Sequence, residues 1–183
     1  MEIATKGQLR WAFLRWAAVT VPFILLLGFA SSRIAPAGSA NRWYMMLVKP
    51  AGTPPDWVFP VAWTALYVLM GIALAMILNA RGSRWRGMAI LLFVAQLLCN
   101  LFWSPLFFGA HQVESALFLL VAIVVLALFT TLVFARIRRT AAWLMVPYLA
   151  WLSYAACLTL GIDRLNPNAA TIVPSASSTQ IEI

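Results

Sequence analysis

Long apolar runs separated by short polar segments dominate the chain. Each run is about as long as the ~20 residues that a helix needs to cross the hydrocarbon core of a bilayer. None alternates apolar and polar residues with the period of two that is typical of membrane β-strands, so the pattern predicts helices. The five predicted membrane-spanning helices are Trp16–Ser32, Trp57–Asn79, Gly87–Gly109, Ser115–Ala135 and Ala141–Ile162.

The connections between these runs differ in length. Those at residues 81–86, 110–114 and 136–140 are short and favour antiparallel packing of successive helices. The first connection, Arg33–Asp56, is long, rich in proline and carries Trp43 and Tyr44. Long loops in compact proteins are commonly functional. We therefore predict an all-α membrane protein, a bundle of five transmembrane helices whose long first loop acts as a lid.

The two ends of the chain differ from this pattern. Basic residues precede the first apolar run and Ala35-Pro36-Ala37 follows it, as in a cleavable signal peptide. Pro36 fits a cleavage site badly, so a retained first helix is the working hypothesis. After Asn166 the composition changes to Pro, Ala, Ser and Thr. This predicts a helical domain over residues 1–166 and a disordered tail over 167–183.

Composition and charge exclude several classes of protein. Of the 183 residues, 63% are hydrophobic and 10% charged, against about 45–50% and about 25% in average soluble domains. The net charge of +8 arises from basic residues between the apolar runs, which indicates membrane orientation rather than a nucleic-acid partner. More of them lie on the N-terminal side than on the side of the first loop. This predicts a cytoplasmic N-terminus if the protein is in an inner membrane; a bacterial inner or outer membrane stays open.

The spans offer little for catalysis. No Asp, Glu, Lys, Arg or His lies in the central part of any span, which argues against ion-coupled transport. The single histidine, His111, lies in a short connection, where it is either a solvated residue or a ligand of haem iron. No metal-ligand cluster, hydrolytic triad or phosphate-binding loop can be assembled. No metal site and no firm catalytic residue are predicted, and no cofactor is required.

Aromatic and amide side chains recur at helical spacing and form stripes on three of the predicted helices. Two interpretations stay open: residues that fill the core and bond to neighbouring helices, or the wall of a pocket for a large, flat, apolar ligand. The stripes are Trp63 with Tyr67 in the second helix, Gln96, Asn100, Trp103 and Phe107 in the third, and Tyr148, Trp151 and Ala155 in the fifth.

Several motifs resemble the translocator protein family, also called the TspO/MBR, peripheral benzodiazepine receptor or tryptophan-rich sensory protein family, in its bacterial type. The longest is Pro54-Pro55-Asp56-Trp57-Val58-Phe59-Pro60-Val61-Ala62-Trp63-Thr64-Ala65-Leu66-Tyr67, preceded by Lys49-Pro50. Others are Trp43-Tyr44, Asn100-Leu101-Phe102-Trp103-Ser104-Pro105, Pro147-Tyr148-Leu149-Ala150-Trp151 and Leu165-Asn166. They follow in family order from about Trp43 to Asn166, two-thirds of the chain.

The resemblance implies a dimeric five-helix membrane protein with a ligand pocket under the first loop. It implies porphyrin or haem-type tetrapyrroles as ligands, with sterols and benzodiazepine-site drugs also in view, and a receptor or sensor role in tetrapyrrole-linked or stress responses. Trp63 and Trp151 match two tryptophans associated with porphyrin binding and breakdown. The ligand-binding residues carried over are Trp43, Tyr44, Pro50, Trp63, Tyr67, Asn100, Trp103, Phe107, Tyr148, Trp151 and Ala155.

Departures from the family pattern leave alternatives open. Ala51-Gly52 follows Lys49-Pro50 where many members have a larger residue, so a looser lid is expected. Tyr154 has no basic residue within five positions after it, so the sterol-recognition pattern fails there. Light-dependent protoporphyrin IX breakdown, with Trp63 and Trp151 as electron or radical donors, is one alternative to a receptor. Transport of tetrapyrroles or sterols is another, and whether the protein is an enzyme stays open.

Overall fold

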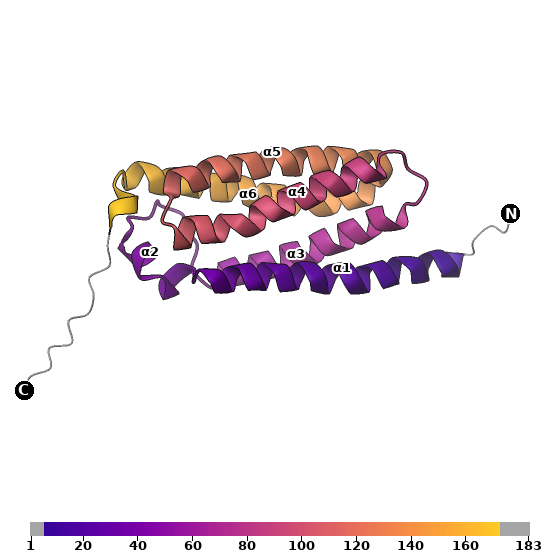
Figure 1. Cartoon of the computed structure of the whole chain (residues 1–183), viewed down its shortest axis with the longest axis horizontal. Helices are drawn as coiled ribbons and strands as arrows, with labels where there is room; N and C mark the ends of the chain where they lie inside the picture. Colours follow the sequence, from indigo (N-terminus) through magenta and orange to yellow (C-terminus); the bar gives the residue numbers. More distant parts are fainter. Residues whose placement is uncertain (1–5, 173–183) are drawn as a thin grey trace, which may run out of the picture.

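The computed structural model describes residues 6–172, and no strand occurs among them. Five helices in this part of the chain are long and apolar enough to cross a membrane. Figure 1 shows them running antiparallel along one axis. The helices are α1 (Lys6–Ile34), α2 (Arg42–Met46), α3 (Val58–Asn79), α4 (Arg86–Ser104), α5 (Val113–Ile137) and α6 (Arg139–Leu165), with single turns η1 (Gly38–Ala40), η2 (Pro105–Gly109) and η3 (Ala169–Thr171).

The predicted five-helix bundle is confirmed. The start of α1 differs most from its prediction, while α5 and α6 extend only two or three residues past the predicted runs at each end. α1 begins at Lys6 rather than Trp16, because the helix continues through the basic residues before the apolar run. The third span ends at Gly109 as predicted, but its last residues, from Pro105 on, form a turn of π-helix instead of α-helix. Proline has no N–H to donate, and the backbone N–H of Ala110 here reaches back to the Pro105 carbonyl over 2.9 Å.

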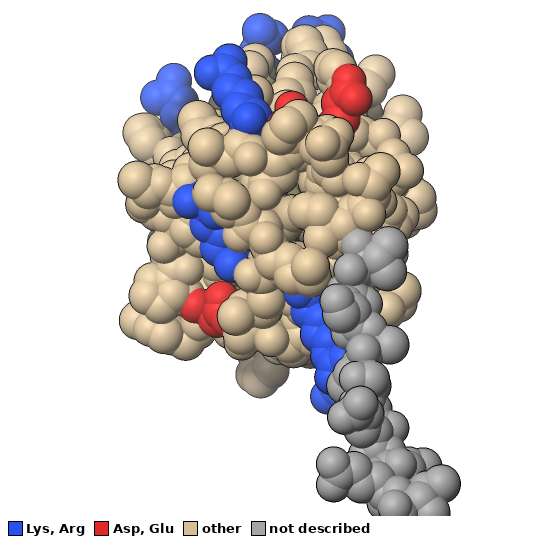
Figure 2. Space-filling model, turned by 90° about the vertical axis from the view of Figure 1, so that its left-hand side faces the viewer, with Lys and Arg blue, Asp and Glu red and all other residues tan. Residues whose placement is uncertain are grey.

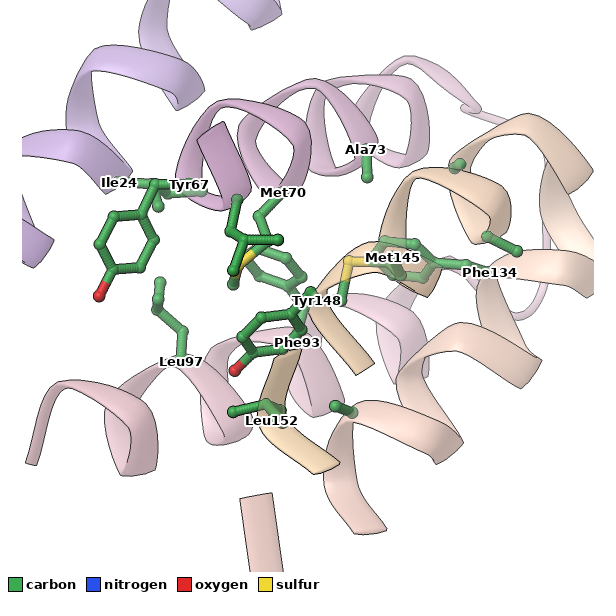
Figure 3. Close-up of a cluster of buried hydrophobic side chains, with 14 of the residues drawn as sticks. Ile24, Tyr67, Met70, Ala73, Phe93, Leu97, Phe134, Met145, Tyr148 and Leu152 are labelled. Carbon is green, nitrogen blue, oxygen red and sulfur yellow. The ribbon is translucent and has the colours of Figure 1, made fainter. Parts of the chain in front are cut away.

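The core lies where α3, α4, α5 and α6 meet. α5 packs on both α4 and α6, while α3 bridges α6 to α1. Figure 3 shows the side chains of the four central helices meeting between them. They include Met70, Phe93, Phe134, Met145, Tyr148 and Leu152, each of which is fully buried.

At Gly71, α3 approaches the backbone of α1 with almost no side chain between the two helices. A Cβ atom on Gly71 would lie 2.7 Å from the Val21 Cα atom, so only glycine fits there. The Thr20 hydroxyl donates a 2.8 Å hydrogen bond to the Gly71 carbonyl across the same contact. Ala73 and Ala75 are also fully buried. The small residues of α3 thus serve helix packing within this chain.

Candidate functional site

The first loop, residues 35–57, folds back onto one end of the bundle around the short helix α2. Asn41 caps this helix: its Oδ1 atom accepts a hydrogen bond from the Tyr44 backbone N–H. The Asn41 side-chain amide also donates to the Phe108 carbonyl at 2.9 Å, which fixes α2 to the end of the third span. Both aromatic residues that the sequence placed in a lid, Trp43 and Tyr44, are consequently buried.

Trp43 is the central anchor of the first loop. Only 1% of its surface is exposed. Its indole N–H donates a 2.8 Å hydrogen bond to the Ala169 carbonyl, and its ring stacks on His111 at 4.4 Å. His111 is half-buried and has a positive φ of 58°, so its ring contacts an indole rather than projecting freely into solvent. Phe107 packs edge-on against the same indole at 5.5 Å.

The contact with Ala169 shows that the segment predicted as a tail, 167–183, begins with folded residues. Ala169–Thr171 form a turn of 3-10 helix, and Ala169 is buried against the cluster around Trp43. The first residues of the segment 167–183 are therefore part of the folded bundle end. The rest of that segment, 173–183, lies outside the described residues.

The second half of the first loop is attached to α6. The Asn166 side chain accepts a hydrogen bond from the Val48 N–H and donates one to the Val48 carbonyl, at 2.9 and 2.8 Å. Pro50 lies directly on the backbone of Gly161, where a Cβ atom would come within 2.9 Å of the proline ring. The Tyr154 hydroxyl donates to the Gly52 carbonyl at 2.6 Å. Pro50, a predicted ligand residue, thus holds the loop to α6.

Asp56 closes the loop on itself. Its carboxylate accepts a 2.7 Å hydrogen bond from the Ser39 backbone N–H. Hydrogen bonds from the hydroxyl and the N–H of Ser39, with a smaller contribution from the charge of Lys49, lower the pKa of Asp56 below its usual value. The charged carboxylate at neutral pH therefore ties the start of the first loop to its end.

Beneath the first loop, the aromatic residues at the end of the third span complete the cluster around Trp43. The Trp103 ring stacks on Phe107 at 5.0 Å, and its indole N–H donates to the Ala116 carbonyl of α5 at 3.0 Å. Tyr44 packs edge-on against Phe107 and Phe108. Four predicted site residues, Trp43, Tyr44, Trp103 and Phe107, are therefore brought together in direct contact.

A second aromatic cluster lies deeper, between α3 and α6. Trp63 packs against Tyr67 at 5.2 Å on its own helix and edge-on against Tyr148 of α6 at 6.4 Å. Trp151 meets Phe59 of α3 at 5.9 Å. The two tyrosines are buried, whereas Trp63 and Trp151 are only half-buried, as is Ala155 one turn beyond Trp151 on α6. The predicted residues on these helices also come together.

Polar groups connect this deeper cluster to α4. The Tyr67 hydroxyl donates to the Asn100 carbonyl oxygen at 3.2 Å, and the Tyr148 hydroxyl donates to the Gln96 carbonyl oxygen at 2.6 Å. Gln96 is fully buried, and its side-chain N–H2 makes no hydrogen bond with the described residues. A buried amide donor without a partner is costly, so Gln96 joins the candidate polar groups of this cluster. The predicted ligand set omitted Gln96, although its place one turn before Asn100 was a signal for it.

Comparison with known proteins bears on the same residues. Residues 18–165 match the profile of the TspO/MBR family, a stretch that runs from within α1 to the end of α6 and includes the first loop. The chain belongs to the TspO/MBR family. With five helices able to span a membrane, this TspO/MBR protein is an integral, multi-pass membrane protein.

Similar proteins come from distant organisms. The chain is 40% identical over 154 residues to the tryptophan-rich protein TspO of Chlorobaculum tepidum, covering 82% of this chain and 95% of that protein. It is 36% identical to the tryptophan-rich sensory protein of Cereibacter sphaeroides, over 82% and 96% of the two chains. It is 39% identical to the translocator protein of Sus scrofa, over 76% and 83%.

The buried polar pair of this TspO/MBR protein can be tested directly. Tyr148→Phe is expected to lower the free energy of unfolding by about 1–2 kcal/mol, because it leaves the whole Gln96 amide without a partner. Adding Gln96→Leu should recover part of that loss, since both polar groups are then removed. The measurement is thermal unfolding in a mild detergent.

Tyr154→Phe is the matched control, because its hydroxyl bond to Gly52 lies on a residue that is 38% exposed. It should change the unfolding midpoint little. Equal losses for Tyr148→Phe and Tyr154→Phe would contradict the special cost assigned to the buried pair.

Proposed function

We propose that this TspO/MBR protein is a membrane receptor or sensor that binds a porphyrin or haem-type tetrapyrrole between α3, α4 and α6, under the first loop. One observation supports the proposal most directly: Trp63, beside the buried Tyr67 and Tyr148, and Trp151, beside Phe59, are only half-buried, so part of each indole surface remains free. Indole faces suit a large, flat, apolar ligand. The family's sensory and translocator names agree with a ligand-responsive role.

The polar groups between the helices complement these aromatic surfaces. Ligand sites are mostly apolar with a few convergent polar groups that fix orientation. Here the unpartnered N–H2 of Gln96 and the amide of Asn100 lie on the α4 stripe that faces the tyrosines of α3 and α6. They would orient the polar edge of a tetrapyrrole. The ligand needs no further cofactor in this proposal.

Access to this site requires movement of the first loop. Trp43, Tyr44 and Phe107 are buried in direct contact with one another at the end of the bundle. A tetrapyrrole is too large to pass through a packed cluster of this kind. We therefore expect binding to be limited by opening of the loop, and a change at the loop to be the signal that a sensor passes on. A homodimer, as the resemblance implies, would provide the partner surface.

The test is a tryptophan-fluorescence titration of the detergent-solubilised protein with protoporphyrin IX. Wild type should give saturable quenching with micromolar affinity. Trp151→Phe should weaken binding about two- to tenfold, corresponding to the ~0.5–1.5 kcal/mol of a specific aromatic contact. Trp143→Phe is the matched control on the same helix. Trp143 is 71% exposed and lies eight residues before Trp151, near the start of α6.

Two outcomes would contradict the proposal. Quenching that does not saturate would indicate partition into detergent. Saturable quenching weakened equally by Trp143→Phe and Trp151→Phe would place the ligand on the outer surface of α6 rather than between the helices.

Light-dependent breakdown of the porphyrin is a second candidate function, favoured by the chain of oxidisable rings at the same place. Trp63 lies 5.2 Å from Tyr67, and Trp151 lies 5.8 Å from Tyr154, between ring centres. Illumination of the complex should then remove the Soret band and give new product absorption, and Trp63→Phe and Trp151→Phe should abolish the product. Binding without a new absorption band would leave the receptor function alone.

A further inference from the structure

An open cavity lies at the end of the bundle opposite the first loop. Its volume is about 700 Å³, within the range of ~300–1,000 Å³ typical of ligand sites. Three separate parts of the chain form it: the first turns of α1, the end of α3 with the connection that follows, and the junction of α5 and α6. Its polar and charged lining includes Gln8, Arg15, Arg81, Ser83, Arg136 and Arg138.

The charge around this cavity is one-sided. Arg15, Arg81, Arg136 and Arg138 are all exposed there. The acidic residues of the described chain are Asp56, Glu114 and Asp163: Asp56 lies in the first loop, and the other two lie at the ends of α5 and α6 that are near that loop. Figure 2 faces the end with the first loop and shows acidic as well as basic side chains there. No described carboxylate therefore neutralises the cavity's arginines.

Membrane orientation alone does not explain this arrangement. The orientation of a membrane protein depends on how many basic residues its connections carry on each side. It does not require those residues to surround the same cavity. Here arginines from α1, from the connection after α3 and from the α5–α6 junction surround one space. Arginine binds phosphate through paired, fork-like hydrogen bonds. Several arginines around one cavity, none of them near a carboxylate of residues 6–172, thus offer a site for phosphate groups.

The surroundings of the cavity favour a lipid over a soluble anion. The cavity lies where α1, α3, α5 and α6 end, and Ala12 and Ile137 contribute an apolar part of its wall. Large aromatic side chains stand exposed near the same ends of the helices: Trp11 by 69%, Trp85 by 37% and Trp143 by 71%. Exposed tryptophans at helix ends are typical of the level of the lipid headgroups.

We propose that this cavity binds the phosphate headgroup of an anionic phospholipid, with a lipid that carries two phosphates fitting best. Basic pockets between transmembrane helices are known to bind such headgroups. The bound lipid would connect α1, α3 and the α5–α6 junction through its phosphates. It would offset the mutual repulsion of the arginines and hold together the end of the bundle that the first loop does not cover. This site is independent of tetrapyrrole binding.

The experiment measures the midpoint of thermal unfolding of the delipidated protein in neutral detergent. Cardiolipin, phosphatidylglycerol, phosphatidylcholine and inorganic phosphate are added in turn. We expect cardiolipin to raise the midpoint most, phosphatidylglycerol less, and phosphatidylcholine and inorganic phosphate little. Native mass spectrometry should show one anionic lipid retained per chain.

The deciding comparison uses two double variants that lose the same charge at the same end of the bundle. Arg81→Gln with Arg138→Gln removes two residues that line the cavity, and it should weaken cardiolipin binding about tenfold or more. Arg10→Gln with Arg84→Gln removes two exposed arginines outside the lining and should leave binding close to that of wild type. If the first variant does not fold, the corresponding lysine pairs, which keep the charge but lose the fork geometry, are compared in the same way.

Each other result would overturn the proposal. Equal weakening in both pairs of variants would mean diffuse attraction to the basic end rather than a site. A midpoint raised as strongly by inorganic phosphate as by cardiolipin would assign the cavity to a soluble anion. Equal shifts with phosphatidylcholine would mean that the protein responds to lipid in general.

Discussion

Trp43→Ala is expected to lower the free energy of unfolding by about 3–5 kcal/mol, the usual cost of removing a large aromatic side chain from a packed core. Trp43 is 1% exposed, packs against His111 and Phe107, and bonds to the carbonyl of Ala169. Its removal takes away the contacts that join the first loop both to the end of the third span and the connection that follows it, at Phe107 and His111, and to the residues after α6. Thermal unfolding in detergent measures the loss.

Trp57→Ala is the matched control in the same loop, because Trp57 is 67% exposed. It should shift the unfolding midpoint little. Hydrogen exchange adds a local readout: in Trp43→Ala the amides of the first loop should exchange faster, while those of α5 keep their protection. Equal destabilisation by both substitutions, or no faster exchange in the loop, would show that Trp43 does not anchor it.

The same substitution separates the role of the first loop from that of the deeper tryptophans. If opening of the loop limits ligand entry, Trp43→Ala should speed the association of protoporphyrin IX even though it destabilises the fold. Trp151→Phe should act on affinity with an unchanged association rate, because Trp151 lies between α3 and α6 rather than in the loop.

The long helices were predictable because the membrane imposes a length and an apolar composition that are visible in the sequence. The five predicted runs are confirmed: they correspond to α1, to α3, to α4 together with the π-helical turn η2, to α5 and to α6. The start of α1 was missed because helix formation does not stop where apolar composition stops. Polar and basic residues such as Arg10 continue the helix beyond the predicted run.

The contacts of the first loop were much less predictable. The partners Trp43 and Ala169 are 126 positions apart, and nothing in the polar composition after Asn166 indicated a buried alanine. His111 stacks on the same indole from a third connection. Helical spacing identifies which residues share a face, but contacts between loops depend on where several helix ends meet in space.

Helical periodicity also predicted which residues share one face of a helix, but not how far each of them lies from the first loop. The stripe of Gln96, Asn100, Trp103 and Phe107 was predicted as one surface. In the structure its two amides bond to the tyrosines of α3 and α6, whereas its two aromatic rings pack under the first loop. Neighbouring helices cross this surface at different heights, so one stripe contributes to two clusters.

The small residues of α3 show the same limit of sequence information. The run Gly71-Ile72-Ala73-Leu74-Ala75 indicates a close helix contact but not the partner. In the structure the partner of Gly71 is α1 of the same chain, through Val21 and Thr20. α1 is therefore closely packed against α3 in this structure.

Gly71→Ala is expected to lower the free energy of unfolding by about 1–3 kcal/mol, the typical cost of overpacking, even though alanine favours helix more than glycine does. The new Cβ atom would lie 2.7 Å from the Val21 Cα atom, and backbone cannot yield as a flexible side chain can. α1 must move away from α3, and the hydrogen bond from Thr20 to the Gly71 carbonyl lengthens with it.

Gly87→Ala is the matched control, because a Cβ atom at Gly87 meets nothing within 4 Å and the residue also lies in a helix. There the same substitution should be neutral or stabilising by up to about 1 kcal/mol, the gain in helix propensity. Opposite signs for the two substitutions, measured as unfolding midpoints in one detergent, separate close packing from propensity. Stabilisation by both would mean that α1 does not pack on Gly71 in the membrane protein, and it would remove the intramolecular role assigned to the small residues of α3.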